Sequence, residues 1–386
     1  MIDRKILAEL QLLLTEYPIV TLLGPRQAGK TTLARHFLKD FSYSNLERPD
    51  IRRFASEDPL AYLSNLRRPV IIDEIQRVPE LLSYIQVLVD EDDQCGQFIL
   101  TGSHQLHLHE AVTQSLAGRT AILNLLPLSI VELAESGIVF DTFEQYCYNG
   151  FLPRVYAKSM RAEKVYANYY KTYVERDVRL LINLRNISLF EKMLHLLAGR
   201  VGQILNYSSL ANDVGVDIKT IKQWLSILES SFVIYKLAPF YENFGKRVIK
   251  APKYYFIDTG LLVFLLGIRQ PEQITRDPLV GSIFENLVVI EILKQRYNSG
   301  FTADIYFFRD SHGNEVDLLI PDHPNFVACE IKSAKTYNSK MFNPIKKLAK
   351  LTDKAVLASL IYSGESMAVG DNFKCLNFKN IATSLF

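Results

Sequence analysis

Short, continuous apolar runs separated by amphipathic stretches set the pattern of the first third of the chain. Ile19–Leu23 has the length and composition of a buried strand, and it follows a stretch, residues 1–17, in which apolar residues recur at helical spacing. A helix is predicted next, over Thr32–Leu38. Further predicted strands are Tyr43–Leu46, Val70–Ile75, Gln97–Ser103 and Ala121–Leu125.

The middle of the chain, from residue 143 to about residue 200, is rich in tyrosine and helical in pattern. Within residues 162–184, five side chains at helical spacing predict a buried stripe: Tyr166, Tyr169, Tyr170, Tyr173 and Val174. Residues 204–237 are typical of a helix-turn-helix. Ser208 or Ser209 is expected to cap its first helix, Ile218–Ser230 forms its second, and the strand Phe232–Leu237 completes a winged-helix pattern.

The last third of the chain predicts a further α/β region. A long helix is expected over Leu279–Tyr297 and a short basic helix over about residues 340–350. The predicted strands are Ile305–Arg309, Glu315–Ile320, Phe326–Lys332 and Ala355–Ile361. Because 386 residues are too many for one ordinary core, two or three domains are expected.

Composition narrows the class of protein. The hydrophobic fraction of 48% and the charged fraction of 22% are typical of a soluble globular protein, and the longest apolar run, Leu261–Ile268, is too short to span a bilayer. The net charge of +2 neither favours nor excludes a nucleic-acid partner. The four scattered cysteines and the N-terminus without a signal-peptide pattern predict a cytoplasmic protein with reduced thiols.

The stretch Gly24–Thr31 matches the phosphate-binding pattern GxxxxGK[ST] between a predicted strand and a predicted helix. Glycines allow successive N–H groups to face an anion, and the helix adds the positive end of its dipole. Lys30 is expected to reach the outer phosphates of ATP, and the Thr31 hydroxyl to bind Mg²⁺. The predicted nucleotide-binding residues are Gly24, Pro25, Arg26, Gln27, Ala28, Gly29, Lys30, Thr31 and Thr32.

Two acids at the end of a later predicted strand are candidates for the residues that promote hydrolysis of the bound nucleotide. Asp73 is expected to hold the Mg²⁺ ion or its water, and Glu74 to polarise the attacking water. The alternative is a pair of solvated carboxylates at a strand end. Ser103 or Thr101, at the end of the next strand, would lie beside the γ-phosphate, although a serine in a turn is an equally simple explanation for Ser103.

These motifs, with Gln76–Leu81 and Ser115–Ser129, resemble prokaryotic AAA+ ATPases that carry a C-terminal domain of unknown function. The resemblance implies a parallel sheet sandwiched by helices, with ATP at the carboxyl ends of the strands. It also implies that Arg119, just before the last strand of this sheet, acts as an arginine finger on a neighbouring subunit. A surface arginine at a helix end is the alternative.

Nucleic-acid contacts are predicted at two places. The second helix of the helix-turn-helix presents few basic residues outward, so protein docking competes with DNA binding there. A basic cluster between residues 246 and 253 is a better candidate for phosphate contacts, with a solvated hairpin as the alternative: Lys246, Arg247, Lys250 and Lys253. Arg176 could reach the nucleotide, although an ion pair is the simpler interpretation.

The C-terminal strand order, with Asp317 on one strand and Glu330 and Lys332 on the next, resembles the PD-(D/E)XK nuclease core. Strand alternation places Glu330 and Lys332 on one face, so Asp317 and Glu330 are expected to share Mg²⁺ while Lys332 positions water. Glu285, on the preceding helix, resembles an additional metal-binding acid of such nucleases. The leading acid does not follow a proline here, and a cross-strand ion pair is the alternative.

The sequence therefore predicts three domains: an AAA+ ATPase domain (residues 1–142), a helical and winged-helix domain (143–240) and a nuclease-like domain (241–386). The leading hypothesis is a Mg²⁺-dependent ATPase coupled to a nuclease-like domain, acting in DNA metabolism or defence and forming homo-oligomers. The alternative is a regulatory ATP switch whose winged helix and catalytically silent C-terminal domain bind a protein partner.

Overall fold

The computed structural model describes residues 2–103, 115–178, 187–240, 251–352, 354–370 and 373–385. Its packing divides the chain into two compact units. The first comprises Met1–Leu128, Ser230–Phe232 and Arg296–Phe301, and the second comprises Ser129–Glu229, Val233–Gln295 and Thr302–Phe386. The division into three domains stays a prediction.

A five-stranded parallel sheet forms the centre of the first unit. Its strands are β1 (Ile19–Leu23), β2 (Ser42–Asn45), β3 (Val70–Asp73), β4 (Phe98–Gly102) and β5 (Thr120–Asn124), in the order β2-β3-β4-β1-β5. All residues of β1 are buried, which explains why this strand is apolar throughout. The strands predicted from the apolar runs are confirmed, with ends that differ by one or two residues.

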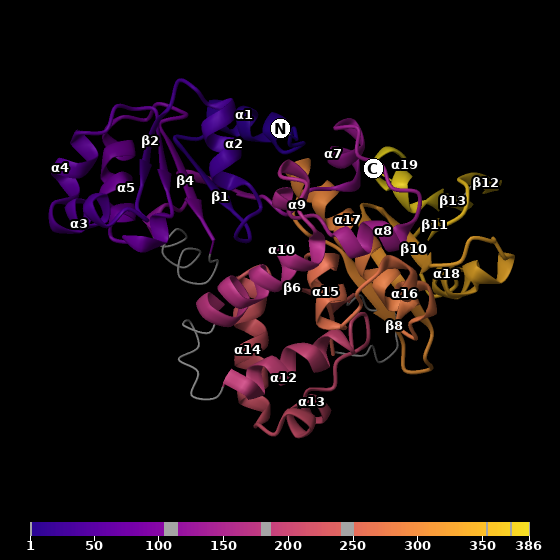
Figure 1. Cartoon of the computed structure of the whole chain (residues 1–386). Helices are drawn as coiled ribbons and strands as arrows, with labels where there is room; N and C mark the ends of the chain where they lie inside the picture. Colours follow the sequence, from indigo (N-terminus) through magenta and orange to yellow (C-terminus); the bar gives the residue numbers. More distant parts are fainter. Residues whose placement is uncertain are drawn as a thin grey trace. The chain divides into compact units, whose positions relative to one another are not determined.

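Helices cover both faces of this sheet, as predicted. They are α1 (Leu7–Glu16), α2 (Lys30–Phe37), α3 (Pro49–Glu57), α4 (Pro59–Ser64) and α5 (Leu81–Glu91), with a 3-10 turn η1 (Ile75–Arg77). Leu10 of α1 and Leu33 of α2 share one apolar core with Val20 and Leu22 of β1. Figure 1 shows α1 and α2 on one side of the sheet and α5 on the other.

The parallel register brings the carboxyl ends of the strands to one edge of the sheet. Leu23 of β1 pairs with Gly102 of β4 and with Asn124 of β5, while Asn45 of β2 pairs with Asp73 of β3. The segment after β1 turns at this edge and enters α2 at Lys30, two residues earlier than predicted. The predicted phosphate loop therefore lies at the edge where Asp73 ends its strand.

The second unit begins with helices. They are α7 (Ile130–Glu135), α8 (Phe143–Asn149), α9 (Pro153–Ala157), α10 (Ala162–Tyr169), a π-helix η2 (Tyr170–Val178) and α12 (Ile187–Ala198). The predicted tyrosine stripe is confirmed, because all five of its side chains are buried: Tyr166, Tyr169, Tyr170, Tyr173 and Val174. The backbone at Arg176 belongs to η2, but its side chain lies outside the described structure, so its role stays a prediction.

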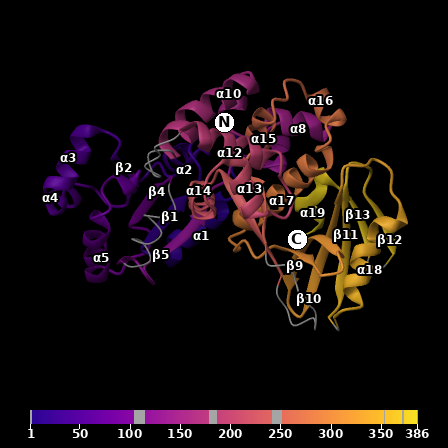
Figure 2. The same cartoon turned by 90° about the horizontal axis from the view of Figure 1, so that it is seen from below.

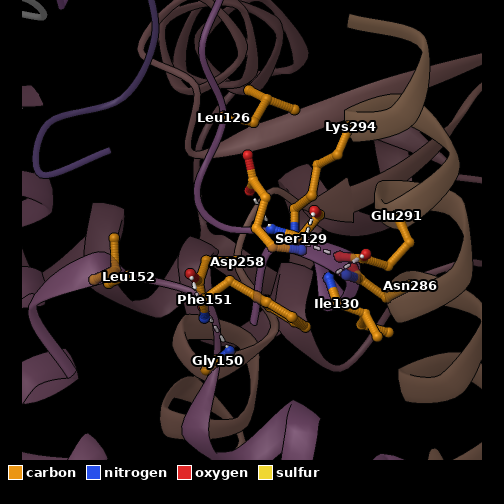
Figure 3. Close-up of polar contacts among 12 residues, drawn as sticks. Leu126, Ser129, Ile130, Gly150, Phe151, Leu152, Asp258, Asn286, Glu291 and Lys294 are labelled. Carbon is orange, nitrogen blue, oxygen red and sulfur yellow. Dashed lines mark hydrogen bonds and ion pairs between the residues drawn. The ribbon is translucent and has the colours of Figure 1, made fainter. Parts of the chain in front are cut away.

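Buried charges fix the start of α7 within this unit (Figure 3). The backbone N–H of Ile130 donates a 2.8 Å hydrogen bond to Oε2 of Glu291, and Oε1 of Glu291 forms a 2.6 Å ion pair with Lys294. The Lys294 ammonium also lies 3.6 Å from the ring centroid of Phe151. Both ionic side chains are almost completely buried, so each depends on the other for compensation of its charge.

The helix-turn-helix pattern is present as α13 (Tyr207–Val214) and α14 (Ile218–Ser230), joined by a turn at Gly215. The prediction of a serine cap is wrong. Asn206 caps α13, because its Oδ1 accepts a 3.1 Å hydrogen bond from the Ser209 N–H. An asparagine before the helix is as good a cap as serine, and Ser208 and Ser209 both lie inside the first turn.

An eight-stranded mixed sheet completes the second unit, in the order β12-β13-β11-β10-β9-β8-β6-β7. Its strands are β6 (Ile234–Pro239), β7 (Lys253–Phe256), β8 (Tyr306–Arg309), β9 (Glu315–Asp322), β10 (Asn325–Lys332), β11 (Val356–Tyr362), β12 (Met367–Gly370) and β13 (Phe373–Asn377). β6 follows the helix-turn-helix and also pairs with β8, so this sheet includes strands from both sides of residue 240. Figure 2 shows β9, β10, β11, β13 and β12 side by side.

Helices flank the strands of this sheet in the sequence. They are α15 (Thr259–Leu265), α16 (Pro271–Arg276), α17 (Val280–Asn298), α18 (Asn343–Ala349) and α19 (Ile381–Ser384), with 3-10 turns η3 (Ser339–Phe342) and η4 (Phe378–Asn380). Ile345 and Leu348 of α18 share a core with Val316 of β9 and Ala328 of β10. The expected α/β class is thus confirmed for both sheets. Among the described residues, no helix has the length and apolar character needed to cross a membrane.

Candidate functional site

The phosphate loop is shaped by two glycines. Gly24 has φ +151°, and a Cβ atom there would lie 2.0 Å from the carbonyl oxygen of Leu125, so no other residue fits without displacing the backbone. Gly29 has φ +98° at the start of α2, again in the left-handed region. Arg4 supports the loop from outside by donating 2.6 Å hydrogen bonds to the carbonyl oxygens of Ala28 and Leu126.

Lys30 is buried at the first position of α2. Its ammonium donates hydrogen bonds to the carbonyl oxygens of Gly24 (2.8 Å) and Pro25 (2.9 Å), so it lies across the opening of the loop. Burial lowers the pKa of Lys30 to about 8, although the carboxylates of Glu74 and Asp73 oppose this shift. The charged form is therefore poorly solvated by the protein alone, which favours an additional anionic partner at this position.

Asp73 is the centre of a hydroxyl network at the same edge of the sheet. Its Oδ2 accepts hydrogen bonds from Thr31 (2.9 Å) and from Tyr43 (2.7 Å), and its Oδ1 accepts one from Thr101. The structure thus brings together the hydroxyl and the carboxylate that were predicted to hold Mg²⁺. Both are hard oxygen donors, which are the ligands that Mg²⁺ prefers, so this pair fits the ion.

Glu74 and Ser103 lie together at this edge of the sheet. Oε2 of Glu74 accepts hydrogen bonds from the Ser103 hydroxyl (3.3 Å) and from the Gln76 side-chain amide, which also donates to Ser103 (3.2 Å). The backbone of Glu74 is left-handed, with φ +60°, and its N–H donates to the Thr101 hydroxyl (3.2 Å). The roles assigned to Glu74 and Ser103 stay predictions, because these contacts fix only their positions.

Other residues of the predicted loop surround this centre. Arg26 lies 3.7 Å from Glu47, and the same Glu47 oxygen lies 3.8 Å from Arg77. Gln27 adopts a left-handed backbone, with φ +64°, inside the loop, and Thr32 belongs to the first turn of α2. Two guanidinium groups therefore lie next to the loop, which adds positive charge to the predicted polyphosphate site.

Arg119 lies at the opposite edge of the sheet, where β5 begins and where the Ile19 N–H donates to the Arg119 carbonyl oxygen (3.3 Å). Its guanidinium forms an ion pair with Asp90 of α5, with Nε 2.5 Å and Nη2 2.8 Å from the two carboxylate oxygens. Arg119 is thus about 17 Å from its own phosphate loop along the strand. It could serve only the nucleotide of another copy, and that role stays a prediction.

In the second unit, Asp317 of β9 and Glu330 and Lys332 of β10 come together as predicted. The Lys332 ammonium lies 2.9 Å from Oδ2 of Asp317 and 2.9 Å from Oε2 of Glu330. The other Glu330 oxygen, Oε1, is buried without a hydrogen-bond partner. Burial, with a contribution from the charge of Asp317, raises the pKa of Glu330 to about 8 despite the nearby lysine.

These three side chains line a pocket of about 330 Å³. Its wall also contains the basic residues Lys340 and Lys347, and Lys347 donates a 2.9 Å hydrogen bond to Oδ1 of Asn314. With Glu315, which also lines it, the pocket combines three carboxylates with three ammonium groups. This is a suitable surface for a phosphate ester. Among the described residues, however, no three His, Cys, Asp or Glu side chains gather in a group that could hold a metal ion.

Two predictions in this region need correction or qualification. Lys253 was expected at a basic surface, but it is 2% exposed on β7 and forms ion pairs with Glu285 (2.9 Å) and Glu315 (2.6 Å), so it cannot contact a phosphate. Lys246, Arg247 and Lys250 lie outside the described residues. Glu285 accepts hydrogen bonds from Lys253 and from Tyr255 (2.6 Å), so its role as a metal ligand stays a prediction that the structure does not favour.

Sequence reasoning missed four side chains that complete these sites. Tyr43 and Gln76 hold the two acids of the first unit, Asp90 pairs with Arg119, and Lys253 pairs with Glu285. Gln76 could have been found from its place two residues after Glu74. The other three gave no signal, because each meets its partner only through the fold.

Comparison with known proteins shows which families this chain resembles. A family described as "AAA domain" matches residues 16–134, and two domains of unknown function, DUF8612 and DUF4143, match residues 140–272 and 280–381. An uncharacterized protein of Mycobacterium tuberculosis is 32% identical over 333 residues, covering 85% of this chain and 73% of that protein. An uncharacterized protein of Haemophilus influenzae is 27% identical over 245 residues, covering 59% of this chain and 58% of that protein.

Among solved structures, a Walker-type ATPase of Pyrococcus abyssi is similar, with a TM-score of 0.46, 18% identity and coverage of 69% of this chain and 96% of that chain. The AAA domain match spans the phosphate loop and the acids Asp73 and Glu74 at the end of β3, and it supports binding and hydrolysis of ATP by this chain. The chain therefore belongs to the family of the mycobacterial protein, and its matching domains make it a prokaryotic P-loop ATPase of the AAA type with a C-terminal domain of unknown function.

Proposed function

We propose that the chain hydrolyses ATP with Mg²⁺ and uses the hydrolysis to control a nuclease-like C-terminal domain that acts on nucleic acid. The observation that carries the first half is the 2.9 Å hydrogen bond from Thr31 to Asp73, which joins the phosphate loop to the acid of the neighbouring motif. Thr31 and Asp73 would hold Mg²⁺, which neutralises phosphate charge when bound. Lys30 would bind the outer phosphates, and Glu74 would accept a proton from the attacking water.

The second half is supported by the arrangement of Asp317, Glu330 and Lys332 around one pocket. Asp317 and Glu330 would hold a divalent cation, whose chemistry is to stabilise negative charge on a phosphodiester. Lys332, with 39% of its side chain exposed, would orient water or stabilise the leaving charge. Lys340 and Lys347 would bind the flanking phosphates, since ammonium groups contact phosphate regardless of base sequence.

Nucleic acid would reach this pocket with help from the helix-turn-helix. α14 is the second helix of this motif, and its Lys222 lies beside a pocket of about 480 Å³ formed with Tyr207 and Ile218. Such a protein would act in DNA metabolism or in defence, as a homo-oligomer if Arg119 serves a neighbouring copy. We place it in the cytoplasm on the sequence pattern alone.

A nuclease assay tests the proposal. The full chain is incubated with single-stranded and double-stranded DNA and RNA, with Mg²⁺ or Mn²⁺, in the presence and absence of ATP. We expect cleavage that is lost in both Asp317→Ala and Lys332→Ala. Lys350→Ala, outside the pocket, is the matched control and should cleave normally. Cleavage that survives the two pocket variants would come from a contaminant.

The alternative function is a regulatory ATP switch with a silent C-terminal domain that binds a protein partner. It is favoured by one observation: the Lys332 ammonium already neutralises both acids at 2.9 Å. Absence of cleavage on every substrate, together with normal ATP hydrolysis, would support this alternative. Retention of one defined protein in the presence of ATP, but not in Lys30→Ala, would then identify the partner.

A further inference from the structure

Three acids of the C-terminal sheet and Glu285 of α17 form two pairs, each bridged by a lysine. Lys332 lies between Asp317 and Glu330, and Lys253 lies between Glu285 and Glu315. The pairs are neighbours, because Glu315 and Asp317 are two residues apart on β9 and therefore share a face. The two lysines thus occupy equivalent places between carboxylates.

The two lysines differ in whether their side chains can move away from the carboxylates. The side chain of Lys332 is 39% exposed and lines the pocket, so it can move into water. The side chain of Lys253 is 2% exposed, and neither it nor Glu285 lines that pocket. The backbone of Lys253 is also held from two sides, by pairing with Leu237 of β6 and by a bridge to Ile204.

Further contacts fix the partners of Lys253. Tyr255, on the same face of β7, donates a 2.6 Å hydrogen bond to the same Glu285 oxygen that binds Lys253. Arg309 of β8 lies 2.9 Å from the second oxygen of Glu315. The Lys253 ammonium therefore lies between two carboxylates that are each held by a further side chain.

We propose that Lys253 is a built-in counterion that limits the C-terminal acids to one divalent cation, held by Asp317 and Glu330. A second ion at Glu285 would have to displace an ammonium that is almost completely buried. The pair Asp317–Glu330 meets no such obstacle, because Lys332 can withdraw and Glu330 Oε1 has no hydrogen-bond partner. This inference rests on the proposed function, since it concerns the cation that the nuclease-like site would use.

Binding of Mn²⁺ to the full chain without nucleotide tests the inference, because the EPR signal of free Mn²⁺ disappears on binding. We expect one ion whose binding is lost in Asp317→Asn. Lys253→Met should bind a second ion that disappears when Glu285→Gln is added. Lys253→Arg, which keeps the charge, should bind one ion. If Lys253→Met does not fold, Lys253→Met/Glu315→Gln removes one charge of each sign and leaves Glu285 available.

The possible results separate the inference from the function on which it rests. Two Asp317-dependent ions in the unmodified chain would overturn the role of Lys253 and leave a nuclease with two metals. A single ion in Lys253→Met, or in its Glu315→Gln combination, would overturn that role as well. No Asp317-dependent ion in the unmodified chain would overturn both the inference and the metal-dependent part of the proposed function.

Discussion

The hydroxyl of Tyr43, on β2, donates a 2.7 Å hydrogen bond to Oδ2 of Asp73, at the end of the neighbouring strand β3. The same oxygen accepts the hydroxyl of Thr31, so the position of the carboxylate depends on both donors. The guanidinium of Arg35, on α2, lies 4.7 Å from the ring centroid of Tyr43 and keeps the ring in place. Tyr43 is therefore a positioning residue for the acid that is predicted to hold Mg²⁺.

Tyr43→Phe should lower kcat for ATP hydrolysis by roughly ten-fold, because a hydrogen bond to a charged group contributes about 1.5–3 kcal/mol. The KM for ATP should change less, since the phosphate loop is untouched. Steady-state ATPase measurements check this expectation. Tyr62→Phe is the matched control, because its hydroxyl pairs with Ser44 (2.7 Å) and not with an acid. An unchanged kcat in Tyr43→Phe would show that Thr31 and Thr101 suffice to hold Asp73.

Gly24→Ala should abolish nucleotide binding. The added Cβ would lie 2.0 Å from the Leu125 carbonyl oxygen, so the loop would have to move away from β5. Titration with a fluorescent ATP analogue measures the loss. Gly118→Ala is the control for backbone strain alone, because Gly118 also has a positive φ (+76°) but a Cβ there would meet nothing within 4 Å. Equal affinity in the two variants would contradict the structure of the loop.

Arg119→Ala should lower ATP turnover by roughly 10³-fold if Arg119 serves the nucleotide of a neighbouring copy. Asp90→Asn removes the same ion pair and keeps the arginine, so it should leave turnover nearly unchanged. Mixing Arg119→Ala with Lys30→Ala should restore part of the activity, since the Lys30→Ala copy supplies Arg119 to the intact phosphate loop of the Arg119→Ala copy. Equal turnover in Arg119→Ala and Asp90→Asn, with no gain on mixing, would show that Arg119 only forms a surface ion pair and has no role in hydrolysis.

Lys294→Met should destabilise the second unit by about 3–5 kcal/mol, because it leaves the buried carboxylate of Glu291 without its cation. Lys294→Met/Glu291→Gln should regain most of this free energy, since glutamine is neutral and still accepts a hydrogen bond from Ile130. Urea unfolding of the four variants of this cycle measures the coupling. Additive losses in the double variant would mean that the two side chains stabilise the fold independently.

The residues that the sequence predicted correctly are those whose neighbours are fixed by a local motif. Thr31 and Asp73 meet because the phosphate loop and α2 follow β1, Asp73 ends β3, and the carboxyl ends of parallel strands share one edge of the sheet. Lys253 shows the limit of such reasoning. It stands near other basic residues in the sequence, but all four residues of β7 are buried, and its side chain meets acids from α17 and β9.

The start of helix α13 was also predicted incorrectly, by a few residues. Asn206 and Ser208 are equally good caps by composition, and only the backbone shows that the first turn begins after Asn206. Tyr43 was correctly placed on a strand, but its partner is set by the order β2-β3, which no local pattern specifies. Local chemistry was therefore predictable, whereas pairings across the sheet were not.

Arg4 connects the phosphate loop to the segment that leads out of the first unit. Its guanidinium ties the Ala28 and Leu126 carbonyls together, and Leu126 is followed within three residues by Ser129, where the second unit begins. A displacement of the loop on binding ATP would pull on that backbone directly. A purification tag fused to the N-terminus would lie close to Arg4 and could disturb this connection. Responses to nucleotide should therefore be measured without an N-terminal tag.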